Sequence, residues 1–143
     1  MKAKIWGKCK NCAVNCCQQK KISHTLFLTK NEKLKFSSIN NSFPCKFLNN
    51  QNLCAIHNQR PVDCTLFPFD IVKKSDKFFW VYWDTNCPIT TEGTRKDFEL
   101  CIIEIEKNII PDFRDNVEAY AHYRFKDFMD NFGAYTILRE VEF

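Results

Sequence analysis

The sequence predicts a small single domain of the α+β class, in which cysteine-rich loops and short strands precede two C-terminal helices. The chain has 143 residues, enough for one core of modest size. Eight of its nine cysteines lie between Cys9 and Cys87, whereas apolar residues at helical spacing appear only after residue 94. We therefore expect one domain over residues 1–143, with a cysteine-cluster region at 9–88 and a helical pair at 94–133.

Short strands are expected in the cysteine-cluster region, before the apolar residues take up helical spacing. Residues 22–28 (ISHTLFL) have the composition of a strand, and residues 34–39 (LKFSSI) are a weaker candidate. Residues 66–72 and 78–83 flank a polar turn, which is typical of a β-hairpin. Pro68 would then lie at an edge or a bulge, because proline has no N–H to donate to a neighbouring strand.

Two amphipathic helices are expected after the hairpin. Thr94 is a candidate N-cap for the first and Pro111 a stop, with an apolar face formed by Phe98, Cys101, Ile102, Ile105 and Ile109. The second helix begins at about Asp112 and ends at Gly133. Its apolar face comprises Phe113, Val117, Tyr120, Ala121, Phe125, Phe128, Met129 and Phe132. Residues 137–143 are expected to return as a short strand.

The first block of cysteines has the spacing of a metal-binding loop. Cys9 and Cys12 are separated by two residues, so that one tight turn can direct both sulfurs at one ion. Cys16 and Cys17 are adjacent, and the planar peptide between them strains any ring that both would close on one ion. The pair therefore indicates either two centres or one ligand with a hydrogen-bonding neighbour.

The second block adds Cys45, Cys54, Cys64 and Cys87, with His57 three residues after Cys54. His57 is either a ligand or a residue whose ring N–H bonds a sulfur or a carbonyl group. Eight thiolates suffice for two four-thiolate centres, and sulfur ligands favour zinc or iron over magnesium or calcium. Two zinc ions, a zinc with an iron–sulfur cluster, and one polynuclear centre all fit this count.

The cysteines also bear on the cellular compartment. The N-terminus, MKAKIWGK, has neither an apolar segment nor a small-residue cleavage site of the secretory kind. Nowhere does the chain reach the roughly 18 consecutive apolar residues that a membrane-spanning helix needs. We therefore expect a cytoplasmic protein without a membrane span, where cysteines bind metal rather than form a disulfide framework.

The formal net charge of +4 conceals an uneven distribution. Seven lysines precede the first acidic residue, Glu32, and 11 of the 17 acidic residues lie from Asp97 onward. A basic arm can bind nucleic acid through its phosphates. Eight thiolates would nevertheless offset these lysines, so we expect metal ions as partners and no nucleic acid, while a protein partner or substrate stays open.

The cysteine segments resemble a known family. CKNCAVNCC, PCKFL, LCAIHNQRPVDCTLFPF and NCP, between residues 9 and 88, are similar to the cysteine-cluster proteins described as putative zinc- or iron-chelating domains, to which the flagellin lysine N-methylases are related. The resemblance implies metal chelation by all eight cysteines of the two blocks. In the methylase branch it also implies an iron–sulfur cluster acting with S-adenosylmethionine.

The remaining candidate residues leave enzyme activity open. Arg60 could donate to thiolates or bind an anionic cofactor, or it could form a salt bridge with Asp63 or Asp70. Cys101 is expected to be a buried core thiol rather than a ligand. The leading hypothesis is a zinc- or iron-binding protein, and the alternative is an iron–sulfur enzyme in redox chemistry or S-adenosylmethionine-linked methyl transfer to protein lysine.

Overall fold

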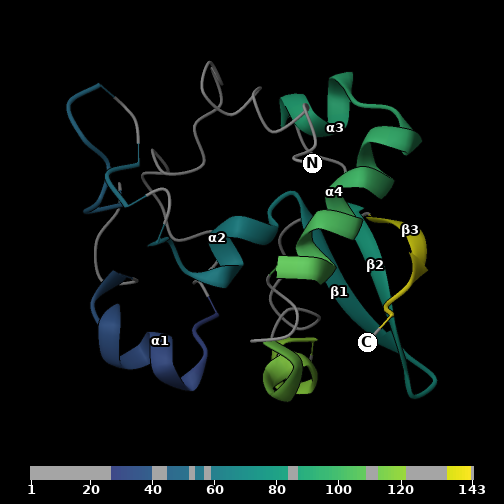
Figure 1. Ribbon diagram of the computed structural model, residues 1–143, viewed down its shortest axis with the longest axis horizontal. Coiled ribbons are helices and arrows are strands. Elements are labelled where there is room, and N and C mark those ends of the chain that lie inside the picture. The colour runs from purple at the N-terminus through teal and green to yellow at the C-terminus, as the bar shows by residue number, and fades with distance from the viewer. Residues whose placement is uncertain are drawn as a thin grey trace.

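Helices and a three-stranded antiparallel sheet share the chain, which confirms the predicted α+β class. The computed structural model describes residues 27–39, 45–51, 54–56, 59–83, 87–108, 113–121 and 135–142. In chain order its elements are α1 (Lys30–Lys35), α2 (Val62–Leu66), β1 (Phe69–Lys74), β2 (Lys77–Trp83), α3 (Pro88–Glu92), α4 (Arg95–Asn108), the 3₁₀ helix η5 (Arg114–Asn116) and β3 (Tyr135–Glu140). Figure 1 shows the sheet and α4 at one end of the molecule, α1 at the other, and α2 between them.

The predicted hairpin is confirmed as β1 and β2. These strands pair antiparallel from Phe69 opposite Tyr82 to Lys74 opposite Lys77. Ser75 and Asp76 form the turn, and both have positive φ, as in the two-residue turns that match the twist of a hairpin. The first strand begins three residues later than predicted, because Leu66 belongs to α2.

The predicted C-terminal strand is confirmed as β3, which pairs antiparallel with β2 at one edge of the sheet. Val81 lies opposite Ile137 but Trp80 lies opposite Arg139, so Leu138 is the extra residue of a β-bulge. The Leu138 side chain is buried in the core, and its carbonyl accepts a hydrogen bond from Arg95 Nη2 at 2.7 Å. The bulge thus fixes β3 to the start of α4.

Helix α4 confirms the first predicted helix and its cap. The Asp97 N–H donates to Thr94 Oγ1 at 3.3 Å, and the Thr94 N–H donates to Asp97 Oδ2 at 2.8 Å. The buried face consists of Phe98, Cys101, Ile102 and Ile105, as the spacing predicts. Gly93 precedes the cap because a Cβ there would lie 2.4 Å from the Ile89 carbonyl oxygen.

A cluster of charged residues ties α4 to β3. Arg139 Nη1 and Nη2 donate to the two carboxylate oxygens of Glu106 at 2.9 and 2.8 Å, and Trp80 Nε1 donates to the same carboxylate at 2.7 Å. Burial alone would raise the pKa of Glu106, but the hydrogen bonds from Arg139 and Trp80 lower it. Glu106 is therefore held as the anion that both donors require.

The second predicted helix is described only at its start. Phe113 is followed by η5 and by helical residues 117–121, and Phe113, Val117, Tyr120 and Ala121 are buried as predicted. The rest of the predicted helix, with Gly133, lies outside the described residues, as does Pro111. None of the helices in the described ranges has the length and hydrophobicity that crossing a membrane requires.

The prediction of a strand at 34–39 is wrong, because this segment begins within helix α1. Thr29 and Glu32 form a capping box, in which the Glu32 N–H donates to Thr29 Oγ1 and the Thr29 N–H donates to Glu32 Oε1. The cap fixes a helix before the alternating residues LKFSSI can pair as a strand. Of the predicted strand at 22–28, only residues 27 and 28 are described, and they form no strand.

Two separate hydrophobic cores are present among the described residues. The small core consists of buried Leu28, Phe36 and Ile39, with Cys45, Phe47 and Ile56 packed against it. The main core joins α2, the sheet, α4 and the 113–121 segment, and its largest buried side chains are Trp80, Tyr120, Phe69, Phe113, Leu66, Ile71, Ile89, Ile102 and Ile105. Phe27 packs against the main core and its neighbour Leu28 lies in the small one.

Candidate metal centre

Four of the eight predicted cysteine ligands are described, and they come from three segments of the chain. Cys45 and Cys54 belong to the loop after α1, Cys64 lies in α2, and Cys87 directly precedes α3. All four side chains are half-buried. Cys9, Cys12, Cys16 and Cys17 lie outside the described residues, as does His57, and their predicted role as ligands stays a prediction.

A short reverse turn brings Cys45 and Cys54 into one structural unit. The Leu48 N–H donates to the Cys45 carbonyl at 3.0 Å, and Leu48 and Cys54 form an antiparallel bridge. The Ala55 N–H then donates to the Phe47 carbonyl at 2.8 Å. Because the Phe47 ring packs edge-on against Phe36, the small core holds this unit against the segment that follows α1.

Cys64 and Cys87 are attached to the main core instead. Val62 and Leu66, on either side of Cys64 in α2, are both buried there, and Cys87 packs against the same core. The Cys87 carbonyl accepts from the Thr90 N–H at 3.0 Å and from Thr90 Oγ1 at 2.9 Å, which fixes the backbone at the start of α3. The described cysteines are therefore divided between two cores.

Two carboxylates join α2 to the segment that carries the small core. Glu32 Oε2 accepts from the Val62 N–H at 2.7 Å, and Asp63 Oδ2 accepts from the Phe27 N–H at 2.7 Å. Asp63 is 3% exposed and Glu32 is half-buried. Each carboxylate thus satisfies a backbone donor on the opposite segment, and buried N–H groups need such acceptors.

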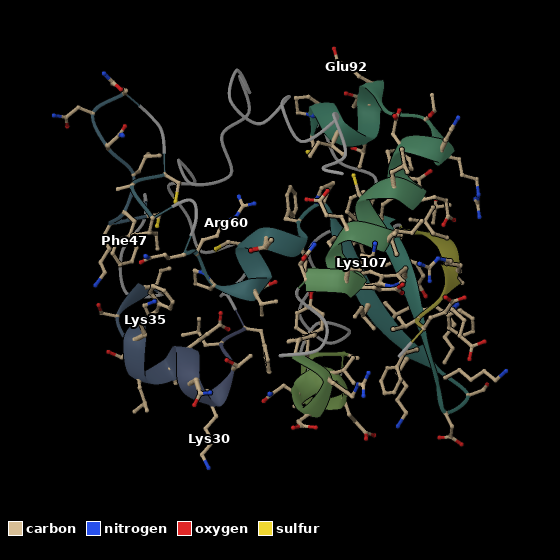
Figure 2. All side chains as sticks on the ribbon, viewed as in Figure 1. Lys30, Lys35, Phe47, Arg60, Glu92 and Lys107 are labelled. Carbon is tan, nitrogen blue, oxygen red and sulfur yellow. The ribbon has the colours of Figure 1, made fainter. Side chains whose placement is uncertain are left out.

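Arg60 lies next to this junction. Figure 2 shows Arg60 near the start of α2, with Lys35 at the end of α1 and Phe47 close to that end. The Arg60 side chain is half-buried, and the salt bridges between described residues do not include it. The ion pair considered with Asp70 is not formed, because other donors occupy that carboxylate. A role for Arg60 in binding an anionic cofactor stays a prediction.

Asp70 lies in the main core and is 2% exposed. Its Oδ1 accepts from the Tyr120 hydroxyl and from the Ile71 N–H, and its Oδ2 accepts from Trp83 Nε1 at 2.9 Å. Burial raises the pKa of Asp70 to about 6, and the three hydrogen bonds oppose this rise. Burial and the nearby Asp70 carboxylate also raise the pKa of Tyr120 well above 10.0. This group fastens the 117–121 helix to β1.

The described residues alone do not assemble a metal site. No disulfide joins any two of the described cysteines. Within the same ranges, no three histidine, cysteine, aspartate or glutamate side chains gather as a group that could hold an ion. The described cysteine thiols nevertheless suit zinc or iron, because thiolates are soft ligands. They lie on turns and short helices, where backbone N–H groups can hydrogen-bond a ligating sulfur.

The structure is thus that of a small α+β protein in which the four described cysteines of the cluster region lie on loops and short helices beside two apolar cores. Residues 8–88 match the model of the CxxCxxCC family, described as a putative zinc- or iron-chelating domain. The match spans more than half of the chain, and the chain belongs to this family. The family description indicates chelation of zinc or iron. A search of the curated proteins and a search of the solved structures each found no match.

The sequence did not predict that the carboxylates of Glu32, Asp63 and Asp70 join separate segments of the chain through hydrogen bonds. For Glu32 a sequence indication exists, because Thr29 and Glu32 have the spacing of a capping box. For Asp63 and Asp70 none does. Both are bonded to residues at least 13 positions away, Phe27 and Trp83, and the sequence alone does not bring these partners together.

Proposed function

We propose that this chain binds zinc or iron through the thiolates of Cys9, Cys12, Cys16, Cys17, Cys45, Cys54, Cys64 and Cys87. The family match carries the proposal, because residues 8–88 contain all eight of these cysteines and exclude only Cys101. Cys101 is fully buried in α4, where it packs in the main core as expected. In this proposal the ions organise the loops between residues 9 and 56, where the described apolar core is small.

The charge around the described cysteines supports thiolate binding. Between residues 27 and 66 the cationic side chains are Lys30, Lys33, Lys35, Lys46 and Arg60, against the carboxylates of Glu32 and Asp63 among the described residues. Both carboxylates accept backbone N–H groups. The excess of cations lowers the repulsion between thiolates that share a centre.

The proposal is tested by elemental analysis and a visible spectrum of protein purified without oxygen. Stoichiometric zinc in a colourless sample supports a closed structural or storage site, whereas a brown sample with iron and sulfide supports a cluster. The iron–sulfur enzyme alternative, with S-adenosylmethionine as cofactor, requires the second result. Protein without stoichiometric zinc or iron would overturn the proposal.

Single substitutions test the ligand set. Cys12→Ser, Cys45→Ser and Cys64→Ser should each lower the metal content, because serine is a poor ligand for soft ions. Cys101→Ser is the matched control and should keep the full content, since its side chain lies in the main core. Equal loss in the control and in the other three variants would show that the ligand assignment is wrong.

A further inference from the structure

The four described cysteines of the proposed centre are attached to two different cores, so the distance between the two cysteine pairs must be fixed by other contacts. Cys45 packs against the small core, and Cys54 is bridged to Leu48 in the same loop. Cys64 lies on α2, whose apolar side chains belong to the main core. Thiolates from both groups can share an ion only where the two cores are held in one arrangement.

The contacts between the two segments are reciprocal. Glu32, in α1, accepts the N–H of Val62, the first residue of α2. Asp63, the second residue of α2, accepts the N–H of Phe27, which precedes α1. Both distances are 2.7 Å, short for a hydrogen bond from a backbone N–H and typical of charged acceptors. Two such bonds in opposite directions define both the position and the orientation of α2.

We infer that Glu32 and Asp63 are positioning residues of the metal centre, which hold α2 with Cys64 at a fixed place relative to the loop that carries Cys45 and Cys54. The inference rests on the proposed function and extends it to two residues that are not ligands. A preformed arrangement of thiols binds metal more tightly than a loose one, because less conformational entropy is lost when the ion binds. Loss of either carboxylate should therefore weaken metal binding without changing the ligands.

A simpler role for Glu32 is capping of α1, and the structure offers a way to separate the two roles. Glu32 Oε1 accepts the Thr29 N–H and Oε2 accepts the Val62 N–H. Thr29→Ala removes the Thr29 side chain from the cap and leaves the bond to Val62 possible. Glu32→Ala removes both the bond from Thr29 and the bond from Val62. Glu32→Gln has a single acceptor oxygen, which can serve only one of the two N–H groups.

Titration of the full-length, metal-free protein with Co²⁺ measures this effect, because thiolate-bound Co²⁺ absorbs in the near ultraviolet. Glu32→Ala and Asp63→Ala should each weaken the Co²⁺ affinity by about tenfold or more, as loss of groups that orient ligands does elsewhere. The absorbance at saturation should stay that of the parent protein. Asp63→Asn retains an acceptor oxygen and should regain much of the affinity. Thr29→Ala should bind as the parent does.

Asp97→Ala is the matched control in the other half of the molecule, since Asp97 also accepts a backbone N–H at the start of a helix, from Thr94. It should leave Co²⁺ affinity unchanged. Parental affinity in both Glu32→Ala and Asp63→Ala would overturn the inference while leaving the proposed function intact. Absence of thiolate absorption in the parent protein would instead refute the proposed function. Weak binding accompanied by loss of the near-ultraviolet circular dichroism of the main core would reflect general unfolding, and it too would count against positioning.

Discussion

The two parts of this molecule hold their backbone in place by different means. The described residues between 69 and 142, here called the sheet part, surround a continuous apolar core in which Trp80 and Tyr120 are almost fully buried. Between residues 27 and 56, here called the cysteine part, the described residues bury only Leu28, Phe36 and Ile39, and no residue of α1 is buried. The first part can be stable by hydrophobic burial alone, whereas the second depends on carboxylate-to-backbone hydrogen bonds and, in our proposal, on bound ions.

Charge follows the same division. Among the described residues from 69 to 142 there are eleven carboxylates and eight cationic side chains, whereas cations predominate from 27 to 66. In the sheet part the charges form specific pairs, such as Arg139 with Glu106. In the cysteine part the lysines have few carboxylate partners available. In our proposal, thiolates supply negative charge to the cysteine part, so that its stability depends on metal while that of the sheet part does not.

Metal removal should therefore produce the largest loss of stability, and this loss should be confined to the cysteine part. Because structural zinc sites contribute on the order of 10 kcal/mol to folding in small domains, chelation should lower the local stability of residues 27–56 by several kcal/mol. The amides of β1, β2 and α4 should stay protected. Hydrogen exchange measured with and without chelator checks this difference. Equal loss of protection in both parts would mean that they form one cooperative unit.

A substitution in the main core should instead destabilise the sheet part and leave the metal centre intact. Trp80 is fully buried, and its Nε1 donates to Glu106. Trp80→Ala should lower the free energy of unfolding of the sheet part by about 3–5 kcal/mol, through lost burial and the cavity that remains. Urea unfolding followed by far-ultraviolet circular dichroism measures this loss. The thiolate-to-metal absorbance should persist at urea concentrations below the transition.

The pH dependence of the sheet part should show the titration of Asp70. Its pKa is raised from 3.8 to about 6, so between these values the folded protein holds a proton that the unfolded chain has released. The contribution of Asp70 to the free energy of unfolding therefore falls as the pH rises through this interval. At about 1.4 kcal/mol per pKa unit, the total change is about 3 kcal/mol.

The measurement compares wild type with Asp70→Asn between about pH 4 and pH 6, with chelator present so that metal release by protonated thiols does not contribute. The stability difference, wild type minus variant, should decrease as the pH rises. Asp97 is a useful contrast, because the N–H and hydroxyl of Thr94 lower its pKa. Wild type minus Asp97→Asn should change in the opposite direction and in a lower interval, with stability lost as the pH falls below about 3.8. A pH-independent difference for Asp70→Asn would show that Asp70 titrates normally.

The two parts also differed in how far the sequence could predict them. In the sheet part, the aromatic strands around a polar turn and the apolar spacing after Thr94 predicted the hairpin and α4, because these elements are determined by burial of their own residues. In the cysteine part, residues 34–39 were predicted as a strand. There α1 is determined by the capping box of Thr29 and Glu32, which outweighs the alternation that follows it.

Short helices around the cysteines were missed for a related reason. Helices α2 and α3 each have five residues, too few to show a helical period in the sequence. The sequence pattern places Leu66 in the following strand, although Leu66 is the last residue of α2. For the metal centre, spacing predicted which residues are candidate ligands. It could not predict how Glu32 and Asp63 join the two segments, since these bonds span 30 and 36 residues.

The smallest expected effect comes from removing a threonine N-cap, an interaction that both parts of the molecule contain. Thr29 and Thr94 each cap a helix, and each accepts a backbone N–H three residues later at 3.3 Å. Thr94→Ala should lower the free energy of global unfolding by about 1 kcal/mol, because α4 is part of the main core. Thr29→Ala removes the same bond from a helix without buried residues, so local opening of α1 absorbs the loss and global stability should barely change. Hydrogen exchange of the α1 amides should increase in Thr29→Ala alone. If both variants lower global stability equally, α1 unfolds together with the sheet, and the proposed independence of the two parts is wrong.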